Sequence, residues 1–98
     1  MPPIMAVHRV PSLTQARYEE VVRRLTGGKT RLESPSDLPF DGLLAHVAAE
    51  TPEGFLIIDV FESAEAVERF NAAMATIPRD VGIESPPEFY PAHTFIAA

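Results

Sequence analysis

The chain has 98 residues, 46% of them hydrophobic, no cysteine and a formal net charge of −6 at pH 7. This length suits one domain, residues 1–98, and the lack of cysteine excludes disulfides, thiol catalysis and thiolate metal sites. The acidic balance, with only eight Lys and Arg residues, argues against a nucleic-acid partner. The sequence has neither a signal peptide nor an apolar segment of the ~20 residues that a membrane span needs, which predicts a cytoplasmic protein without a membrane partner.

The first third of the sequence predicts a strand followed by an amphipathic helix. Residues 4–10 form a short β-branched run, which favours a strand. The helical spacing i, i+3, i+4, i+7 then places four apolar side chains on one face: Tyr18, Val21, Val22 and Leu25. We expect this helix to begin at Thr14, with Ser12 as the competing cap, and to end at Gly27-Gly28.

The middle of the sequence predicts a long loop and two strands. Residues 29–41 contain two prolines and no period, which is typical of a long loop that serves as a lid or is simply mobile. Two apolar runs follow, over residues 42–50 and 55–62, and a Thr-Pro-Glu-Gly turn separates them. This pattern predicts a hairpin of two strands.

The last third predicts a second helix and a final strand. Ser63 is a good N-cap, and apolar residues then repeat at spacings of three, four and three: Val67, Phe70, Met74 and Ile77. Pro78 either interrupts this helix or stands at the start of a short continuation. A Pro-Pro break precedes residues 88–96, which favour a strand.

The element order β-α-β-β-α-β predicts an α+β fold of the ferredoxin-like kind. Right-handed crossovers in both halves give a split sheet with strand order 4-1-3-2 and two helices on one face. The strand over residues 55–62 is apolar on both of its sides, and a sheet that is apolar on both faces is covered on both. Because the chain has no third layer, we expect a second copy to cover the other face, in a homodimer.

Three stretches resemble a known family: AVHRVPSLTQARYEEVV, GLLAHVAAETPEGFLIIDVFESAEAVERF and PEFYPAHTFI. Together they are similar to the small antibiotic biosynthesis monooxygenase-like proteins of the dimeric α+β barrel superfamily, and DVFESAEAVERF is the most telling part. The resemblance covers nearly the whole chain. It implies a ferredoxin-like protomer that pairs with its twin through the sheets, with a pocket between sheet and helices. Relatives include cofactor-free mono-oxygenases, cyclases, isomerases and haem enzymes, so the resemblance assigns no single activity.

The register of the hairpin decides how His46 and Asp59 lie. If residues 51–54 form a type I turn with a bulge at Gly54, which the turn residues favour, His46 lies opposite Val60. Asp59 then points to the other face, as a structural residue toward the dimer seam. In the alternative register, a two-residue loop at Pro52-Glu53, or a four-residue loop over residues 51–54, places His46 directly opposite Asp59. We expect the bulged register.

His46 is the first catalytic candidate, because an imidazole in an apolar cavity can act as an acid or a base. The alternative is a core histidine that bonds a backbone carbonyl or water. His93 in the last predicted strand is the second catalytic candidate. Five further residues are candidates for contacts with a substrate: His8, Tyr18, Phe61, Phe70 and Tyr90. No metal site is expected, because the three histidines share no short ligand spacing. No haem site is expected either, because haem needs an axial ligand and a larger cavity.

Two functions remain open at this point. The first is a small enzyme, without a bound cofactor, that acts on an apolar or aromatic, polyketide-like metabolite in the manner of a mono-oxygenase or a cyclase. A histidine would stabilise an enolate or phenolate that then reacts with oxygen or closes a ring. The alternative is a non-catalytic ligand-binding or assembly module with structural histidines.

Overall fold

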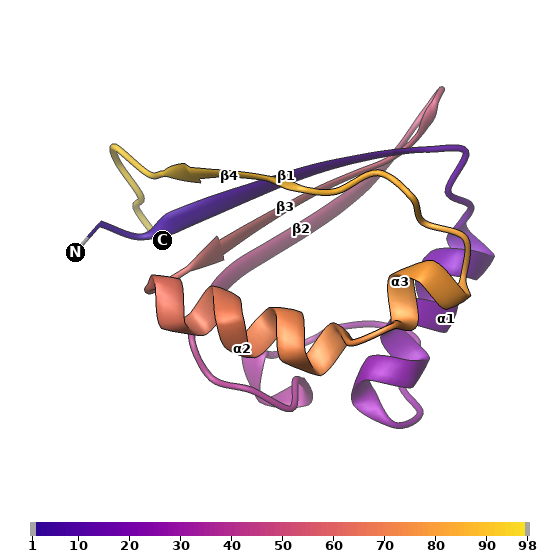
Figure 1. The fold of residues 1–98 in the computed structure, drawn as a ribbon, viewed down its shortest axis with the longest axis horizontal. Helices are drawn as coiled ribbons and strands as arrows, with labels where there is room; N and C mark the ends of the chain where they lie inside the picture. Colours follow the sequence, from indigo (N-terminus) through magenta and orange to yellow (C-terminus); the bar gives the residue numbers. More distant parts are fainter. Residues whose placement is uncertain (1, 98) are drawn as a thin grey trace.

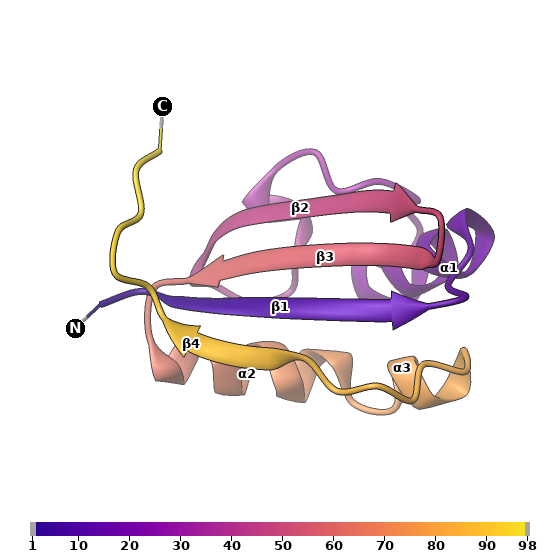
Figure 2. The ribbon, with the colours of Figure 1, turned by 90° about the horizontal axis from the view of Figure 1, so that it is seen from above.

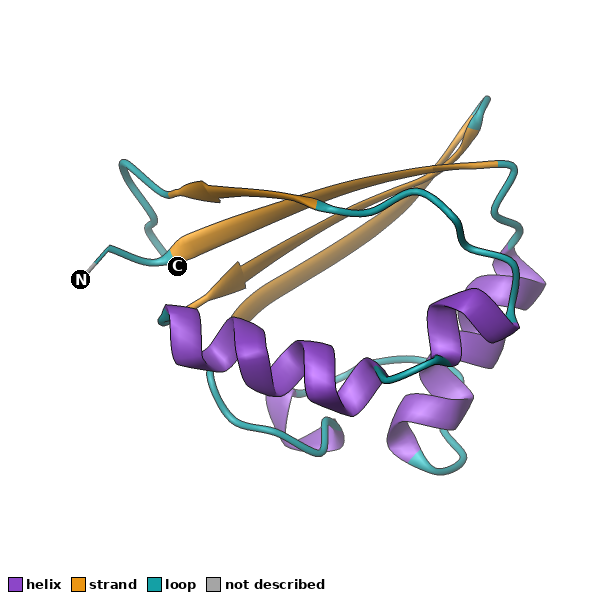
Figure 3. Ribbon diagram, in the orientation of Figure 1, coloured by secondary structure: helices purple, strands orange, loops and turns teal. Residues whose placement is uncertain are grey.

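The computed structural model describes residues 2–97 and is an α+β fold, as predicted. One antiparallel four-stranded sheet carries its helices on one face (Figures 1 and 3). The strands are β1 (Ile4–Pro11), β2 (Leu43–Thr51), β3 (Gly54–Phe61) and β4 (Glu88–Pro91). Their order across the sheet is β2-β3-β1-β4, so β3 and β1 are central.

Helix α1 (Gln15–Thr26) begins and ends where the sequence predicts. Thr14 is the N-cap, because its hydroxyl oxygen accepts a hydrogen bond from the backbone N–H of Arg17 at 3.2 Å. Gly27 closes the helix in the left-handed conformation, at φ 78°, which a residue without a side chain adopts at no steric cost.

The long segment after α1 is more ordered than a plain loop. It contains a 3₁₀ turn, η1 (Pro35–Asp37), which Ser34 and Asp37 close with a capping box. The Asp37 carboxylate also accepts hydrogen bonds from the Lys29 ammonium, at 2.8 Å, and from the backbone N–H of Glu33, at 2.9 Å. One aspartate thus ties the segment together on the helix side of the sheet (Figure 1).

The second half follows the prediction except at its end. Helix α2 (Ala64–Met74) is capped by Ser63, and α3 (Ile77–Asp80) is the short continuation with Pro78 in its first turn. The last strand is shorter than expected, since β4 ends at Pro91 rather than at residue 96. It runs antiparallel to the beginning of β1, where Pro91 already lies opposite Ile4, so little of β1 is left for later residues to pair with.

The expected bulge at Gly54 is wrong. Thr51 lies opposite Gly54 and His46 lies opposite Asp59, so the hairpin turns through a two-residue loop. Gly54 adopts φ 142°, and a Cβ there would lie 2.3 Å from the carbonyl oxygen of Val10. Glycine is needed because the end of β1 crosses the turn closely, not because a bulge is present. The irregularity of β2 lies at its other end, between residues 43 and 45.

The two faces of the sheet differ. The helix-covered face holds two hydrophobic clusters of buried residues: Ala6, Phe61 and Ala66 in one, and Val10, Leu13 and Phe55 in the other. Figure 2 views the sheet from the opposite, open side. There Val47 lies opposite Ile58, and Val60 lies between Ala45 and Met5, so the open face is also apolar. No helix within residues 2–97 is both long and apolar enough to cross a bilayer.

Candidate functional site

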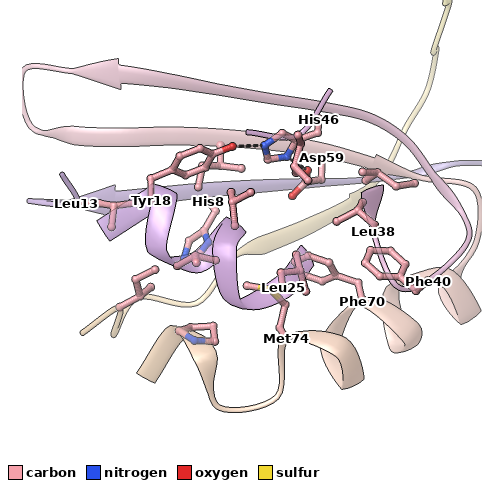
Figure 4. Close-up of a pocket in the computed structure, with 17 residues that line it drawn as sticks. His8, Leu13, Tyr18, Leu25, Leu38, Phe40, His46, Asp59, Phe70 and Met74 are labelled. Atoms are coloured by element: carbon pink, nitrogen blue, oxygen red, sulfur yellow. Dashed lines mark hydrogen bonds and ion pairs between the residues drawn. The ribbon is translucent and has the colours of Figure 1, made fainter. Parts of the chain in front are cut away.

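A cavity of about 70 Å³ lies between the covered face of the sheet and the helices (Figure 4). Most of its lining is apolar and comes from three elements besides the sheet: Val22 and Leu25 of α1, Leu38 and Phe40 of the long loop, and Phe70 and Met74 of α2. An engineered cavity of ~150 Å³ is known to hold benzene. The cavity by itself therefore has room for less than one aromatic ring.

A second hollow lies next to the cavity, beside His46. This hollow of about 220 Å³ shares four lining residues with the cavity: Leu32, Leu38, Leu43 and His46. Two of these, Leu32 and Leu38, belong to the loop that the Asp37 contacts hold in place. The cavity and this hollow therefore adjoin at the His46 imidazole and at the loop leucines.

The polar part of the cavity wall is a chain of three hydrogen-bonded side chains. The Tyr18 hydroxyl lies 2.6 Å from Nε2 of His46, and Nδ1 of His46 lies 2.5 Å from Oδ1 of Asp59 (Figure 4). Asp59 is only 8% exposed. The Tyr18 ring stacks on Phe55, with centroids 5.1 Å apart and planes within 13°, which holds the hydroxyl in position.

The chemistry of the three groups shows which ring nitrogen of His46 carries a proton and which group donates each hydrogen bond. A carboxylate only accepts hydrogen bonds, so Nδ1 of His46 carries the proton that it donates to Asp59. In the neutral imidazole, Nε2 then has a lone pair and accepts the hydrogen bond of the Tyr18 hydroxyl. Burial, and secondarily the negative charge of Asp59, raise the pKa of Tyr18 above its ordinary value. Tyr18 is thus held as a neutral phenol.

The fold brings together the three hydrogen-bonded side chains from separate parts of the sequence. The hairpin register places His46 and Asp59 side by side on the covered face, and the first turn of α1 brings Tyr18 above them, with its backbone N–H bonded to the carbonyl of Thr14 at 2.9 Å. Asp59 therefore faces the cavity, and its predicted orientation toward a dimer seam is wrong. The cause is the register, since a shift of one residue moves a side chain to the other face.

Two of the other predicted substrate contacts do line the cavity. His8 reaches it from β1, with its Nε2 2.5 Å from the carbonyl oxygen of Ser85, and Phe70 reaches it from α2. Phe61 does not line it: its side chain is fully buried beneath Phe70, with ring centroids 5.2 Å apart. Phe61 is a core residue.

The structure does not bring Tyr90 or His93 to the cavity. Tyr90 pairs with Met5 on the open face, is 46% exposed and donates a hydrogen bond to Glu88. His93 is exposed and contacts the neighbouring hydroxyl of Thr94. Tyr90 misses the cavity because its register opposite Met5 places it on the open face. His93 misses it because β4 ends at Pro91, after which the chain leaves the sheet (Figure 2).

Sequence reasoning missed two parts of the site. One is the hydrogen bond from Tyr18 to His46, which joins residues 28 positions apart. The other is the contribution of the long loop, whose Leu32, Leu38 and Phe40 line the cavity. The available signal was their apolarity, because large apolar side chains in a loop that lacks periodicity need something to pack against.

No cluster of three or more His, Asp or Glu residues suited to a metal ion occurs within residues 2–97. Comparison of the chain with protein-family models gives no match, and comparison with curated proteins gives no significant match either.

Proposed function

We propose that the chain is a ferredoxin-like protomer of the dimeric α+β barrel kind, similar to the antibiotic biosynthesis monooxygenase-like proteins. The order β2-β3-β1-β4 with helices on one face supports this assignment. The open face supports the dimer: Val47 and Tyr90 are 58% and 46% exposed there, and such a surface favours a protein partner. The partner in this proposal is a second copy, joined through the sheets.

The proposed ligand is an apolar or aromatic small molecule that occupies the cavity and the adjoining hollow. The lining of aliphatic and aromatic side chains supports this, since ligand sites are commonly apolar with a few convergent polar groups. Here the polar groups are His8, Tyr18, His46 and Asp59. The proposal requires no cofactor, because an acid–base group next to an activated carbon acid is sufficient for enolate chemistry.

The proposed reaction is proton removal followed by reaction with oxygen or by ring closure. The observation that carries it is the His46–Asp59 pair in the wall of an apolar cavity. Asp59 orients the imidazole and stabilises the imidazolium that forms when His46 accepts a proton. For an anthrone, the enolate would react with O₂ to give the anthraquinone and one water molecule, so that all atoms balance.

Oxygen uptake and quinone formation with anthrone as the probe test this function. We expect the wild-type protein to accelerate both, and His46→Gln to lower the rate by a factor of ~10²–10⁴, the usual range for a general base. His93→Gln tests the second sequence candidate and is expected to keep the wild-type rate, because its side chain lies outside the cavity. If the wild type does not accelerate the oxidation of anthrone or of related phenols, the enzyme assignment is contradicted.

A non-catalytic binding or assembly module is the second candidate, and one observation favours it. Both ring nitrogens of His46 already have protein partners, Tyr18 and Asp59, as in a purely structural network. This candidate predicts no turnover with any probe, while His46→Gln still lowers the free energy of unfolding. Turnover and urea unfolding are measured on both the wild type and His46→Gln. Turnover by the wild type favours the enzyme, whereas a loss of stability in His46→Gln without any turnover favours the binding module.

A further inference from the structure

His46 offers no free nitrogen to a ligand. An imidazole has two ring nitrogens, and here Nδ1 bonds Asp59 at 2.5 Å while Nε2 bonds the Tyr18 hydroxyl at 2.6 Å. Asp59 is 8% exposed and lies beside His46 on the covered face. A molecule in the cavity therefore meets the outer end of this chain, which is the tyrosine.

The Tyr18 hydroxyl has capacity for one more partner. A phenol donates one hydrogen bond and has lone pairs that accept others, and the one bond found for it within residues 2–97 joins it to His46. Tyr18 lines the cavity and also a surface hollow that contains Phe55 and Leu32. Its oxygen is thus positioned to accept a hydrogen bond from a ligand that enters there.

The charges of the cavity oppose an anionic ligand. None of the described residues that line it is Lys or Arg, and its ionisable groups are His8, Tyr18, His46 and Asp59. The surface hollow beside Tyr18 adds one cation, Arg31, against two carboxylates, Glu19 and Glu50. A carboxylate or phosphate would lose its hydration without gaining a cation, next to the Asp59 charge. An uncharged molecule with a hydroxyl loses less hydration free energy on entry, because the Tyr18 oxygen replaces the water molecule that accepted its hydrogen bond.

We propose that Tyr18, rather than His46, is the catalytic residue that touches the ligand, and that the ligand is an uncharged phenol or enol whose hydroxyl donates to the Tyr18 oxygen. This inference rests on the proposed function and names the ligand class of the same site. The ligand O–H bond breaks and its proton passes to the Tyr18 oxygen, while the Tyr18 proton passes to Nε2 of His46. The products are a ligand oxyanion and an imidazolium, which Asp59 stabilises.

The ionisation of Tyr18 agrees with this route. Burial and the negative charge of Asp59 raise its pKa, so a free tyrosinate is disfavoured. The two proton movements are therefore coupled: Tyr18 gains one proton as it gives up the other. The tyrosine remains neutral before and after the step.

Binding of four probes to wild type and Tyr18→Phe, measured by calorimetry, tests the inference. The probes share one ring system: 2-naphthol, 2-methoxynaphthalene, 2-naphthoate and naphthalene. We expect 2-naphthol to bind wild type about fivefold to tenfold more tightly than 2-methoxynaphthalene, the usual worth of one hydrogen bond, and at least about tenfold more tightly than 2-naphthoate. In Tyr18→Phe, the difference between 2-naphthol and 2-methoxynaphthalene disappears, whereas naphthalene binds as before.

The outcomes separate the inference from the proposed function. If 2-naphthoate binds wild type as tightly as 2-naphthol, or if Tyr18→Phe keeps the full preference for 2-naphthol, the inference is overturned while ligand binding stands. If none of the probes binds wild type, the proposed function fails and the inference with it. The comparison among probes on wild type needs no variant, so a Tyr18→Phe protein that folds poorly does not weaken the test.

Discussion

The two faces of one β-sheet have taken different roles in this protein. On the covered face, Phe61 is fully buried and Asp59 is 8% exposed, whereas on the open face Val47 is 58% exposed. Both faces are apolar, yet among residues 2–97 the one buried polar side chain, Asp59, lies on the covered face. There it ends the hydrogen-bonded chain Tyr18–His46–Asp59, whose other two members are half-buried. A polar network inside an apolar layer is expensive unless it is fully satisfied. These differences are the basis for proposing the covered face as the ligand site and the open face as the dimer interface.

The largest difference between the faces is expected in stability. Phe61→Ala removes a fully buried side chain and is expected to lower the free energy of unfolding by ~3–5 kcal/mol. Val47→Ala, the matched truncation on the open face, is expected to change the unfolding of the monomer by less than about 0.5 kcal/mol. Urea unfolding at low protein concentration measures both. Equal losses in the two variants would remove the distinction between the faces.

Gly54 tests the register that puts His46 and Asp59 on the covered face. Gly54→Ala is expected to cost ~1–3 kcal/mol more than Gly28→Ala. Both glycines have positive φ angles, 142° and 148°, but only at Gly54 would a Cβ collide with neighbouring backbone. Thermal or urea unfolding of the two variants gives the difference, and similar losses would argue that the close approach of β1 to the turn is not essential.

The open face is tested by self-association. Light scattering of the wild type is expected to give twice the 10.7 kDa mass of one chain. Val47→Glu places a carboxylate in the proposed interface, where it would lose its hydration, and is expected to weaken the dimer at least about tenfold. Glu33→Gln, a substitution on the exposed long loop, serves as the control. A wild type that is monomeric at micromolar concentration would contradict the dimer.

The smallest expected effect is the pH dependence of the two tyrosines. Both have raised pKa values, Tyr18 chiefly through burial and Tyr90 chiefly through its hydrogen bond to Glu88. A pKa that is raised in the folded state contributes stability below the unfolded value of about 10, and this stability is lost as the pH rises through the folded pKa. Stability should thus fall less steeply above about pH 10 in Tyr18→Phe than in wild type.

Salt distinguishes the two tyrosines. Added salt is expected to reduce the contribution of the exposed Tyr90 to the pH dependence of stability, because salt ions screen its interaction with Glu88. The contribution of Tyr18 is expected to stay nearly unchanged. Unfolding of wild type, Tyr18→Phe and Tyr90→Phe at low and high salt provides the comparison. An equal salt response would indicate that Tyr18 is not buried as described.

The local features of this fold were predictable from the sequence, because they depend on nearby residues. The caps at Thr14 and Ser63 and the short helix that begins beside Pro78 follow from side chains within one turn of each helix end. The hairpin register was not predictable from the turn residues. It depends on Gly54 meeting the backbone of β1, a contact between segments more than 40 residues apart.

The same distinction applies to the site. His46 was identifiable as a lone imidazole in an apolar strand, but its partners depend on tertiary structure. Asp59 reaches it through the register, and Tyr18 through the packing of α1 on the sheet. His93 was misplaced because the length of β4 is set by where β1 begins, which the sequence of the last strand does not reveal.

The hydrogen-bonded chain on the covered face is the central claim, and the imidazole ¹H–¹⁵N spectrum of the protein tests it most directly. We expect His46 to carry its proton on Nδ1, with slow exchange that Asp59→Asn abolishes, and we expect Tyr18→Phe to shift the Nε2 resonance alone. The exposed His93 serves as the internal reference. If His46 shows the same tautomer mixture and the same rapid proton exchange as His93, the chain Tyr18–His46–Asp59 does not exist in solution.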